Sequence, residues 1–573
     1  MGTRKPYVGP MVRRYVHTGV SRRSNVQSAS LTVIGGTNDG GPKVCIDDGC
    51  LIGFEDTSRL NRTFSSFLGI PYAKPPIGEL RFKPPENPEP WDTREAKKDG
   101  NMCIAAMYFR NEDDPPGSED CLYLNVYTPV LPEIGVSSPD LPVMVFFHPG
   151  GFMFWSGTTY HFQPHFFMDR GVILVTLNYR LNILGFLSTE DEVAPGNWGL
   201  KDQVHALQWV NDNIGAFGGD PDKVTIFGGS AGGASVHYHM LSPLSRGLFT
   251  KAIAQSGLAN ARWAYSLKNE AREHAEYIGQ HFNCPTENST VLVDCLRKKP
   301  AEELIEADPI FFVWSIDPLI KFPPVVEPDI EGAFLMEMPN DLLNSGKFAD
   351  VPFMAGIMSK EGVLRSGAIM SHDNILQNYD VLKLKSFSNS LHFYQHPVED
   401  VIKIIDKINK YYFKGKRLTL KQENNMIHMF SDRYFVHPLV KAVEMQRKHQ
   451  KSPIYLYSFE YEGPKSFATV FGRELSTPLN GTAHLDDYLY LFPMEKTFFK
   501  NDPWTRSSEE DEMIERMLDI LTNFAIFGNP APSFSGFTWN PVKSEDHEYL
   551  VIKGPHDLKM SLKLRSDAVA FWD

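Results

Sequence analysis

The sequence lacks an excess of basic residues, any apolar run long enough to cross a bilayer, and any internal repeat. Of its 573 residues, 57 are lysine or arginine and 70 are aspartate or glutamate, so the formal net charge is −13. A nucleic-acid-binding protein needs a dominant basic face, and a transmembrane helix needs about 20 consecutive apolar residues. We therefore expect no nucleic-acid partner and no integral membrane segment.

Residues 1–38 lack acidic side chains, and they also lack the apolar core of a secretory signal peptide. Their charged side chains are all basic, namely Arg4, Lys5, Arg13, Arg14, Arg22 and Arg23. This composition favours a disordered tail or a misassigned start over a transit peptide, and we expect the tail to be dispensable for catalysis. No linker rich in glycine, serine or proline follows it, so residues 39–573 are predicted to form a single domain.

Cysteine is rare as well, with 6 in the chain, although an even number is compatible with disulfides. Disulfides would favour a secreted protein or one in the lumen of the secretory pathway. The absence of a visible signal peptide leaves a cytoplasmic or organellar location open. Triplets of the N-x-[ST] type begin at Asn61, Asn288 and Asn480, and each is a weak candidate for glycosylation because such triplets are common by chance.

Continuous apolar runs indicate strands that are buried on both faces of a sheet. Such runs occupy residues 141–148, 172–177 and 223–227, and an Asp-Gly turn inside residues 43–54 predicts a hairpin. Helical spacing of apolar residues predicts helices over 200–214, 266–282 and 511–527. The order strand, helix, strand indicates an α/β sheet with crossover helices, whereas residues 300–450 give no clear pattern.

Glycines surround Ser230 in the stretch "KVTIFGGSAGG", where a predicted strand meets a predicted helix. Serine is a poor nucleophile unless it is exposed and next to a base. A sharp strand-to-helix turn exposes its hydroxyl but strains the backbone, which requires small neighbours such as Gly228 and Gly232. The N–H of Ala231 would then open the helix and point at a developing oxyanion. The alternative is an ordinary glycine-rich helix start.

The partners of such a serine are open from the residues alone. Gly150 and Gly151 end a predicted strand and are candidates for further oxyanion donors, or for a plain turn. Among 18 histidines, His484 stands out in a polar loop before an apolar segment, and Glu361 follows a short apolar run in a turn bounded by glycines. Neither assignment excludes the alternatives. His237 and His239, which follow Ser230 on the predicted helix, lack metal-ligand spacing with any partner and are expected to face away from the serine.

Together these motifs resemble the carboxylesterase–cholinesterase family of α/β-hydrolases, and most closely its insect carboxylesterases. The resemblance runs from about residue 43 to the end of the chain. It rests on "FLGIPYAKPPIGELRF", "SEDCLYLNVYTP", "NYRLNILGFL", "GNWGLKDQ", "FGGSAGG", "QSG", the loop that carries Glu361, and "GTAHLDD".

The resemblance implies an α/β-hydrolase fold, in which helices flank a large, twisted and mostly parallel central sheet. It also implies a catalytic triad of Ser230, Glu361 and His484. The implied oxyanion hole consists of Gly150, Gly151 and Ala231, the implied disulfides are Cys103–Cys121 and Cys284–Cys295, and no metal or organic cofactor is needed.

Three departures from the family pattern bear on the site. Pro149 replaces the first glycine of an H-G-G-G motif, and we expect a stiffened oxyanion hole because both donor positions survive. Gly229 replaces the glutamate that usually precedes the nucleophile, which should weaken attraction for cationic substrates. Juvenile-hormone esterases usually have glutamine there, so that specific activity is a weaker expectation. The segment between Cys103 and Cys121 contains no tryptophan, which argues against a cholinesterase.

The leading hypothesis is a serine carboxylesterase that hydrolyses small, neutral, apolar esters through an acyl-enzyme. The alternatives are a catalytically silent adhesion or scaffold protein on the same fold, and an esterase that sequesters organophosphates. Aromatic runs at residues 152–155 and 311–312 are candidates to line an apolar gorge, with plain core packing as the alternative.

Overall fold

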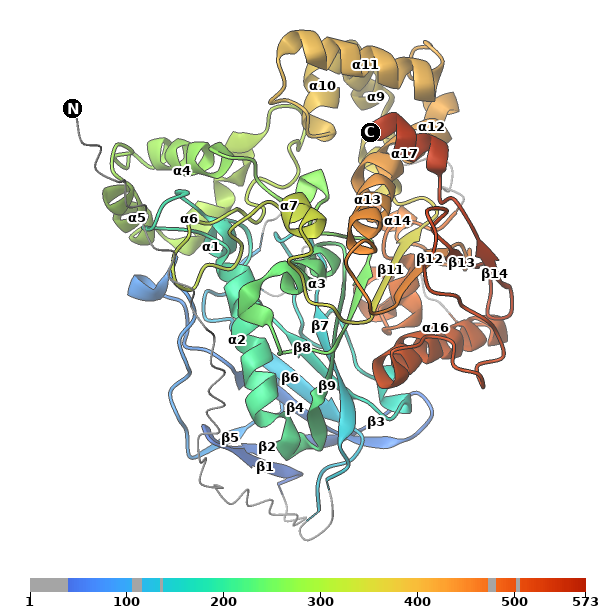
Figure 1. Cartoon of the computed structure of the whole chain (residues 1–573). Coiled ribbons are helices and arrows are strands. Elements are labelled where there is room, and N and C mark those ends of the chain that lie inside the picture. The colour runs from blue at the N-terminus through green and yellow to red at the C-terminus, as the bar shows by residue number, and fades with distance from the viewer. Residues whose placement is uncertain (1–39, 106–115, 134–137, 473–480, 501–504) are drawn as a thin grey trace, which may run out of the picture. The chain divides into compact units, whose positions relative to one another are not determined.

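The computed structural model describes residues 40–105, 116–133, 138–472, 481–500 and 505–573 (Figure 1). The predictions for residues 1–38 and for Asn480 therefore lie outside the described residues. In the described part, eleven strands form one sheet. Their order is β14 (Leu558–Ser561), β13 (Tyr549–Ile552), β12 (Ile454–Phe459), β11 (Phe353–Met358), β10 (Lys251–Gln255), β9 (Gly219–Gly229), β7 (Leu141–Phe147), β8 (Ile173–Leu177), β6 (Tyr123–Thr128), β4 (Thr63–Pro71) and β3 (Phe54–Thr57).

The central strands of this sheet are parallel. Every neighbouring pair from β8 through β13 runs in the same direction, and antiparallel strands occur only towards the two edges. Both faces of the central strands are buried, which explains why they read as continuous apolar runs rather than as alternating ones. The predicted α/β class with a mostly parallel sheet is confirmed.

The strands predicted at residues 141–148, 172–177 and 223–227 are β7, β8 and β9. The predicted hairpin is also present, as β1 (Lys43–Ile46) and β2 (Gly49–Ile52), and β5 (Thr93–Glu95) pairs with β2 to complete a small second sheet. Strand β9 is longer than the apolar run because Gly219 at its beginning pairs with Leu141 of β7. The run therefore marks the buried centre of β9 but not its ends.

The helices have the following bounds: α1 (Asn182–Phe186), α2 (Trp198–Asn213), α3 (Ala231–Leu241), α4 (Glu270–His281), α5 (Ser289–Arg297), α6 (Ala301–Glu306), α7 (Pro339–Asn344), α8 (Val363–Met370), α9 (Asp373–Val381), α10 (Lys383–Ser390), α11 (Val398–Phe413), α12 (Glu423–Ser431), α13 (His437–Gln446), α14 (Ala468–Phe471), α15 (Glu495–Phe498), α16 (Ser508–Phe527) and α17 (Ser566–Trp572). Helices α2, α3 and α16 pack against the central strands. None of the helices in the described ranges is both long and apolar enough to cross a membrane.

The three predicted helices correspond to α2, α4 and α16, with different starting points. Helix α16 begins earlier than predicted because Ser507 and Glu510 form a capping box. Helix α4 begins later than predicted because Asn269, in the left-handed region at φ 71°, precedes its first turn. Residues 300–450, which gave no clear pattern, contain β11 and the helices from α6 to α13. Figure 1 shows α9, α10, α11 and α12 gathered at the end of the sheet away from β1, β2 and β5.

All six cysteines are paired in the structure. The two pairs that the family resemblance implies, Cys103–Cys121 and Cys284–Cys295, are both present. The third pair, Cys45–Cys50, joins β1 and β2 across their turn. Of the glycosylation triplets, Asn61 and Asn288 are both exposed.

Candidate active site

Ser230 lies at the turn between β9 and α3, with its backbone in the left-handed region at φ 54°. A non-glycine residue is strained in this region, and such strain is typical of functional positions. The flanking glycines are needed because the chain comes very close to neighbouring backbone. A Cβ added to Gly228 would lie 2.6 Å from the carbonyl oxygen of Phe147, and one added to Gly232 would lie 2.0 Å from the same atom. The structure therefore has the sharp strand-to-helix turn that the sequence predicts at Ser230.

His484 and Glu361 are in direct contact. The Nδ1 atom of His484 lies 2.5 Å from Oε2 of Glu361, whose side chain is fully buried. The other oxygen of Glu361 accepts hydrogen bonds from the Ser256 hydroxyl at 2.5 Å and from the Met358 N–H at 2.8 Å. A carboxylate held in this way keeps the proton of His484 on Nδ1 and leaves Nε2 as an acceptor. That Nε2 is buried and has no hydrogen-bond partner within the described part of the chain.

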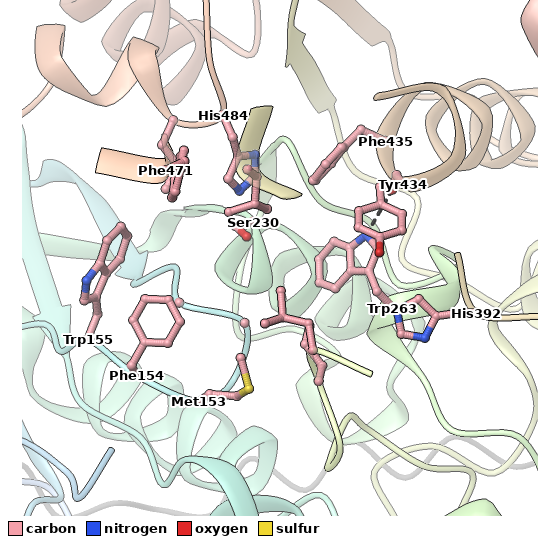
Figure 2. A pocket seen from close by; sticks show the side chains of 16 residues that line it. Met153, Phe154, Trp155, Ser230, Trp263, His392, Tyr434, Phe435, Phe471 and His484 are labelled. Carbon is pink, nitrogen blue, oxygen red and sulfur yellow. Dashed lines mark hydrogen bonds between the residues drawn. The ribbon is translucent and has the colours of Figure 1, made fainter. Parts of the chain in front are cut away.

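One pocket brings Ser230 and His484 together, and its empty volume is about 600 Å³ (Figure 2). In Figure 2 the two residues lie between two groups of mostly apolar side chains. One group contains Met153, Phe154, Trp155 and Phe471, and the other contains Trp263, His392, Tyr434 and Phe435. Such a pocket can hold an apolar substrate on both sides of a reacting bond.

Gly150 and Gly151 also line this pocket, directly after β7. Both have positive φ values, 112° and 61°, and a Cβ added to Gly150 would lie 2.1 Å from the carbonyl oxygen of Phe154. Ala231 is the first residue of α3, so its N–H has no acceptor within the helix. These three residues can place N–H donors around an oxyanion next to Ser230. Preceding them, Pro149 accepts a hydrogen bond at 2.7 Å from Nδ1 of His148 through its carbonyl oxygen.

The other sequence candidates have structural roles. His239 contacts Ser245 and Gln203, and His237 accepts a hydrogen bond from the N–H of Ala259, so both bond to groups away from Ser230. No cluster of histidine, cysteine and carboxylate side chains that could hold a metal ion occurs among the described residues. Of the aromatic runs, residues 153–155 line the pocket, whereas Phe311 packs on Phe322 in the core, which is the alternative that the sequence left open.

Sequence reasoning did not identify the second group of pocket side chains. Trp263 precedes α4, His392 follows α10, and Tyr434 and Phe435 lie in a π-helical turn, Asp432–Val436, that joins α12 and α13. A π-helical turn shifts side chains off the regular helical face and often occurs at functional sites. No local sequence signal distinguishes such a turn from an ordinary helix.

Asp487 is a buried acid close to Glu361. It accepts hydrogen bonds from Gln255 at 2.6 Å and Tyr457 at 3.1 Å, and burial, together with the charge of Glu361, raises its pKa to about 7. An unfolded aspartate has a pKa of about 3.9, so the folded protein binds the extra proton between about pH 4 and pH 7. Stability contributed by this group is therefore lost as the pH rises through that window, by up to about 1.4 kcal/mol per pH unit.

We predict that Asp487→Asn removes this contribution. The unfolding free energy of the wild type, relative to the variant, should fall between pH 5 and pH 7 and level off above pH 7, as measured by urea denaturation. Asp406→Asn, on the exposed face of α11, is the matched control and should follow the wild-type pH profile. Identical pH dependence of the wild type and Asp487→Asn would contradict the prediction.

Gly229 lies against the side chains that follow His484. A Cβ at this position would lie 2.6 Å from the hydroxyl oxygen of Tyr488 and 2.8 Å from Cδ2 of Leu485. The Tyr488 hydroxyl is buried and has no hydrogen-bond partner in the ranges that the structure describes. Because Leu485 lines the pocket beside His484, any residue larger than glycine at position 229 pushes on the loop that carries the histidine.

We therefore predict that Gly229→Ala is harmful although it adds only one methyl group. Overpacking should cost about 1–3 kcal/mol of stability, and displacement of the His484 loop should lower kcat/KM for an ester about 10- to 100-fold. Gly171→Ala is the control, because a Cβ there meets no atom within 4 Å. Steady-state kinetics and thermal unfolding of both variants check this prediction. Wild-type activity in Gly229→Ala would contradict it, because it would show that the loop accommodates the methyl group without displacing His484.

Comparisons with known proteins agree with the family resemblance seen in the sequence. The model of the carboxylesterase family matches residues 40–572. The chain is 38% identical over 559 residues to juvenile hormone esterase of Tribolium castaneum, covering 93% of each chain. It is 35% identical over 535 residues to venom carboxylesterase-6 of Apis mellifera, covering 93% of this chain and 94% of that one. A crystal structure of juvenile hormone esterase from Manduca sexta, with OTFP covalently attached, superposes with a TM-score of 0.81 at 29% identity, covering 93% of this chain and 98% of that chain.

Proposed function

Because this chain belongs to the carboxylesterase family and is a carboxylic ester hydrolase, we propose that it hydrolyses neutral, apolar esters through Ser230, His484 and Glu361. The observation that carries the proposal is one buried arrangement. His484 contacts Glu361 through Nδ1, and its unpartnered Nε2 shares a pocket with the strained Ser230. Nucleophilic catalysis by serine needs this set of groups in this order.

The proposed reaction has two halves. Ser230 Oγ attacks the ester carbonyl while His484 Nε2 takes its proton, and the N–H groups of Gly150, Gly151 and Ala231 stabilise the negative oxygen. His484 then gives the proton to the departing alcohol, which leaves an acyl group on Ser230. In the second half, water gives a proton to His484 and attacks the acyl carbonyl, and His484 then returns the proton to Ser230 Oγ as the bond between Ser230 and the acyl carbon breaks and the acid is released. Glu361 stabilises the imidazolium in both halves.

The described pocket lining favours neutral substrates over cationic ones. It contains no aspartate or glutamate side chain among the residues that the structure describes. Trp155 and Trp263 do offer aromatic faces, on which a quaternary ammonium gains about 0.5–2 kcal/mol. Against this gain, the positive charges of Arg262 and Arg433 act on one end of the pocket, where they help to lower the pKa of His392. The proposed preference for neutral over cationic substrates therefore depends on charge and not on a missing tryptophan.

We predict that kcat/KM rises about fourfold for each methylene from acetyl to butyryl esters of a neutral alcohol, because each buried methylene contributes about 0.8 kcal/mol. Butyrylcholine should be at least about tenfold poorer than a neutral butyrate. Steady-state kinetics on the purified protein measure both effects. Faster hydrolysis of butyrylcholine would overturn the neutral-substrate proposal and leave the triad proposal standing.

The three disulfides also bear on location. Disulfides form and persist in oxidising compartments, so we propose that the protein resides in the secretory-pathway lumen or is secreted. Asn61 and Asn288 are exposed and would then be available for glycosylation. Glycosidase treatment of the protein isolated from its natural source would lower its apparent mass if either site is occupied.

A further inference from the structure

One end of the active-site pocket carries a polar side chain, His392, among mostly apolar neighbours. In Figure 2, Trp263, Tyr434 and His392 lie on the side of Ser230 opposite Trp155, and we call this side the His392 arm. His392 follows α10, and its ring centroid lies 5.9 Å from that of Tyr434. Phe435 then connects this arm to the reacting groups, since its ring centroid is 4.8 Å from that of His484.

The other polar groups in the His392 arm already have partners. Trp263 Nε1 donates a hydrogen bond to the carbonyl oxygen of Tyr434 at 2.9 Å, and the Tyr434 hydroxyl donates to the carbonyl oxygen of Ser390. His392 differs from them: the side chain is 6% exposed and lines the pocket. No hydrogen bond to either of its ring nitrogens is found among the described residues, and these nitrogens are not among the fully buried unpartnered atoms, so they can meet a ligand in the pocket. A substrate that excludes water from this end of the pocket loses affinity unless it supplies a hydrogen-bond partner.

The charge state of His392 restricts what this ligand group can be. Burial, with the positive charges of Arg262 and Arg433, holds the pKa of the imidazole well below 6.5. The neutral ring therefore offers one N–H donor and one acceptor at neutral pH. The two arginines have partners of their own, because Arg262 pairs with Glu270 at 3.1 Å and Arg433 donates to the carbonyl oxygen of Leu391 at 3.2 Å. A neutral oxygen acceptor suits this environment better than a carboxylate, whose burial is costly.

We propose that His392 is a specificity-determining residue that donates a hydrogen bond to an ether or carbonyl oxygen in the substrate. The substrate class is then an apolar ester with one neutral oxygen placed away from the scissile ester group. The inference rests on the proposed function, because the position of the His392 arm matters only if Ser230 is the nucleophile. The rest of the arm is apolar or already hydrogen-bonded, so an oxygen elsewhere along the chain finds no donor and loses affinity.

The test is to move one ether oxygen along the carbon chain of the substrate. Two sets of esters are needed, octanoates of 4-nitrophenol and octyl acetates, because either the acyl or the alcohol chain can occupy the His392 arm. In each set, successive methylenes are replaced by oxygen, and kcat/KM is measured with the wild type. We expect kcat/KM to fall at most positions and to recover at one position in one set. A steady fall without recovery in both sets would overturn the proposal, and this result requires no variant.

A variant pair then identifies the donor. His392→Phe keeps a planar ring without nitrogens, and His396→Phe is the matched control, exposed on the same segment. Loss of one neutral hydrogen bond should lower the ratio of kcat/KM for the recovering ester to kcat/KM for the parent hydrocarbon ester about 2- to 12-fold in His392→Phe. His396→Phe should match the wild type for both esters. Equal effects of His392→Phe on both esters would show a packing role only, and would overturn the proposal.

Measuring how uncleaved ester binds to Ser230→Ala distinguishes failure of the His392 proposal from failure of the proposed function. Uncleaved ester should bind Ser230→Ala more tightly than the double variant with His392→Phe, by the same 2- to 12-fold factor, in isothermal titration. Equal affinities would overturn the role of His392 and leave the nucleophile standing. Continued hydrolysis by Ser230→Ala would instead overturn the proposed function.

Discussion

Ser230→Ala is expected to lower ester hydrolysis by about 10⁴-fold or more, with no loss of folded protein. The alanine removes only the attacking oxygen, and the small side chain fits the crowded turn between β9 and α3. Covalent labelling by a fluorophosphonate should stop as well, because the same oxygen forms that bond. Labelling also tests the organophosphate-sequestering alternative, in which the wild type would label fully but recover activity slowly.

A matched control for this variant lies one turn further along α3. Ser235 is fully buried and donates to the carbonyl oxygen of Ala231 at 2.9 Å, but it does not line the pocket. Ser235→Ala should keep both labelling and turnover within about tenfold of the wild type, while losing about 1 kcal/mol of stability. If Ser230→Ala still labels and turns over esters, Ser230 is not the nucleophile.

Glu361→Gln is expected to have the second large effect, a fall in kcat of about 10⁴-fold. The amide oxygen can still accept from Ser256 and Met358, so the amide nitrogen faces Nδ1 of His484. A donor in that place forces the imidazole proton onto Nε2, and the ring can no longer accept the proton of Ser230. KM should change little, because Glu361 does not line the pocket.

Asp487→Asn serves as the control for loss of a buried carboxylate in the same region. Asp487 bonds Gln255 and Tyr457, and no hydrogen bond between it and His484 is found among the described residues, so this variant should keep kcat within about tenfold. Turnover by Glu361→Gln at a similar level would show that the orientation of His484 does not depend on a carboxylate. It would leave the assignment of Ser230 untouched.

The turn at Ser230 could be predicted from sequence because the glycines that it requires stand next to the serine in the chain. Gly228 and Gly232 are required by backbone atoms that lie within a few residues of the turn or on the adjacent strand β7. Continuous apolar runs likewise predicted β7, β8 and β9, since burial on both faces leaves a direct signal in composition. The ends of β9 and of α4 were less predictable, because strand pairing and one left-handed asparagine set them.

The proposed partners of Ser230 could not be fixed by local reasoning. Glu361 follows β11, which pairs through β10 with β9, and a bridge between Lys360 and Ala483 brings the loop of His484 beside it. Family resemblance supplied what residue patterns left open among 18 histidines. The His392 arm escaped both approaches, since His392 lies in the turn after α10 while Tyr434 and Phe435 lie in the turn between α12 and α13, and the apolar residues around both look like ordinary core.

The long sequence separation between the proposed catalytic residues predicts that activity appears late in folding. The bond between His484 and Glu361 joins residues 123 positions apart, and that between Glu361 and Ser256 spans 105. Contacts of such high order form slowly, because the entropy of closing a long loop is lost before the contact rewards it. A partly folded chain can therefore be compact and contain many helices while Ser230 is still unreactive. Under the proposed function, a chain whose central sheet is incomplete would therefore have no esterase activity.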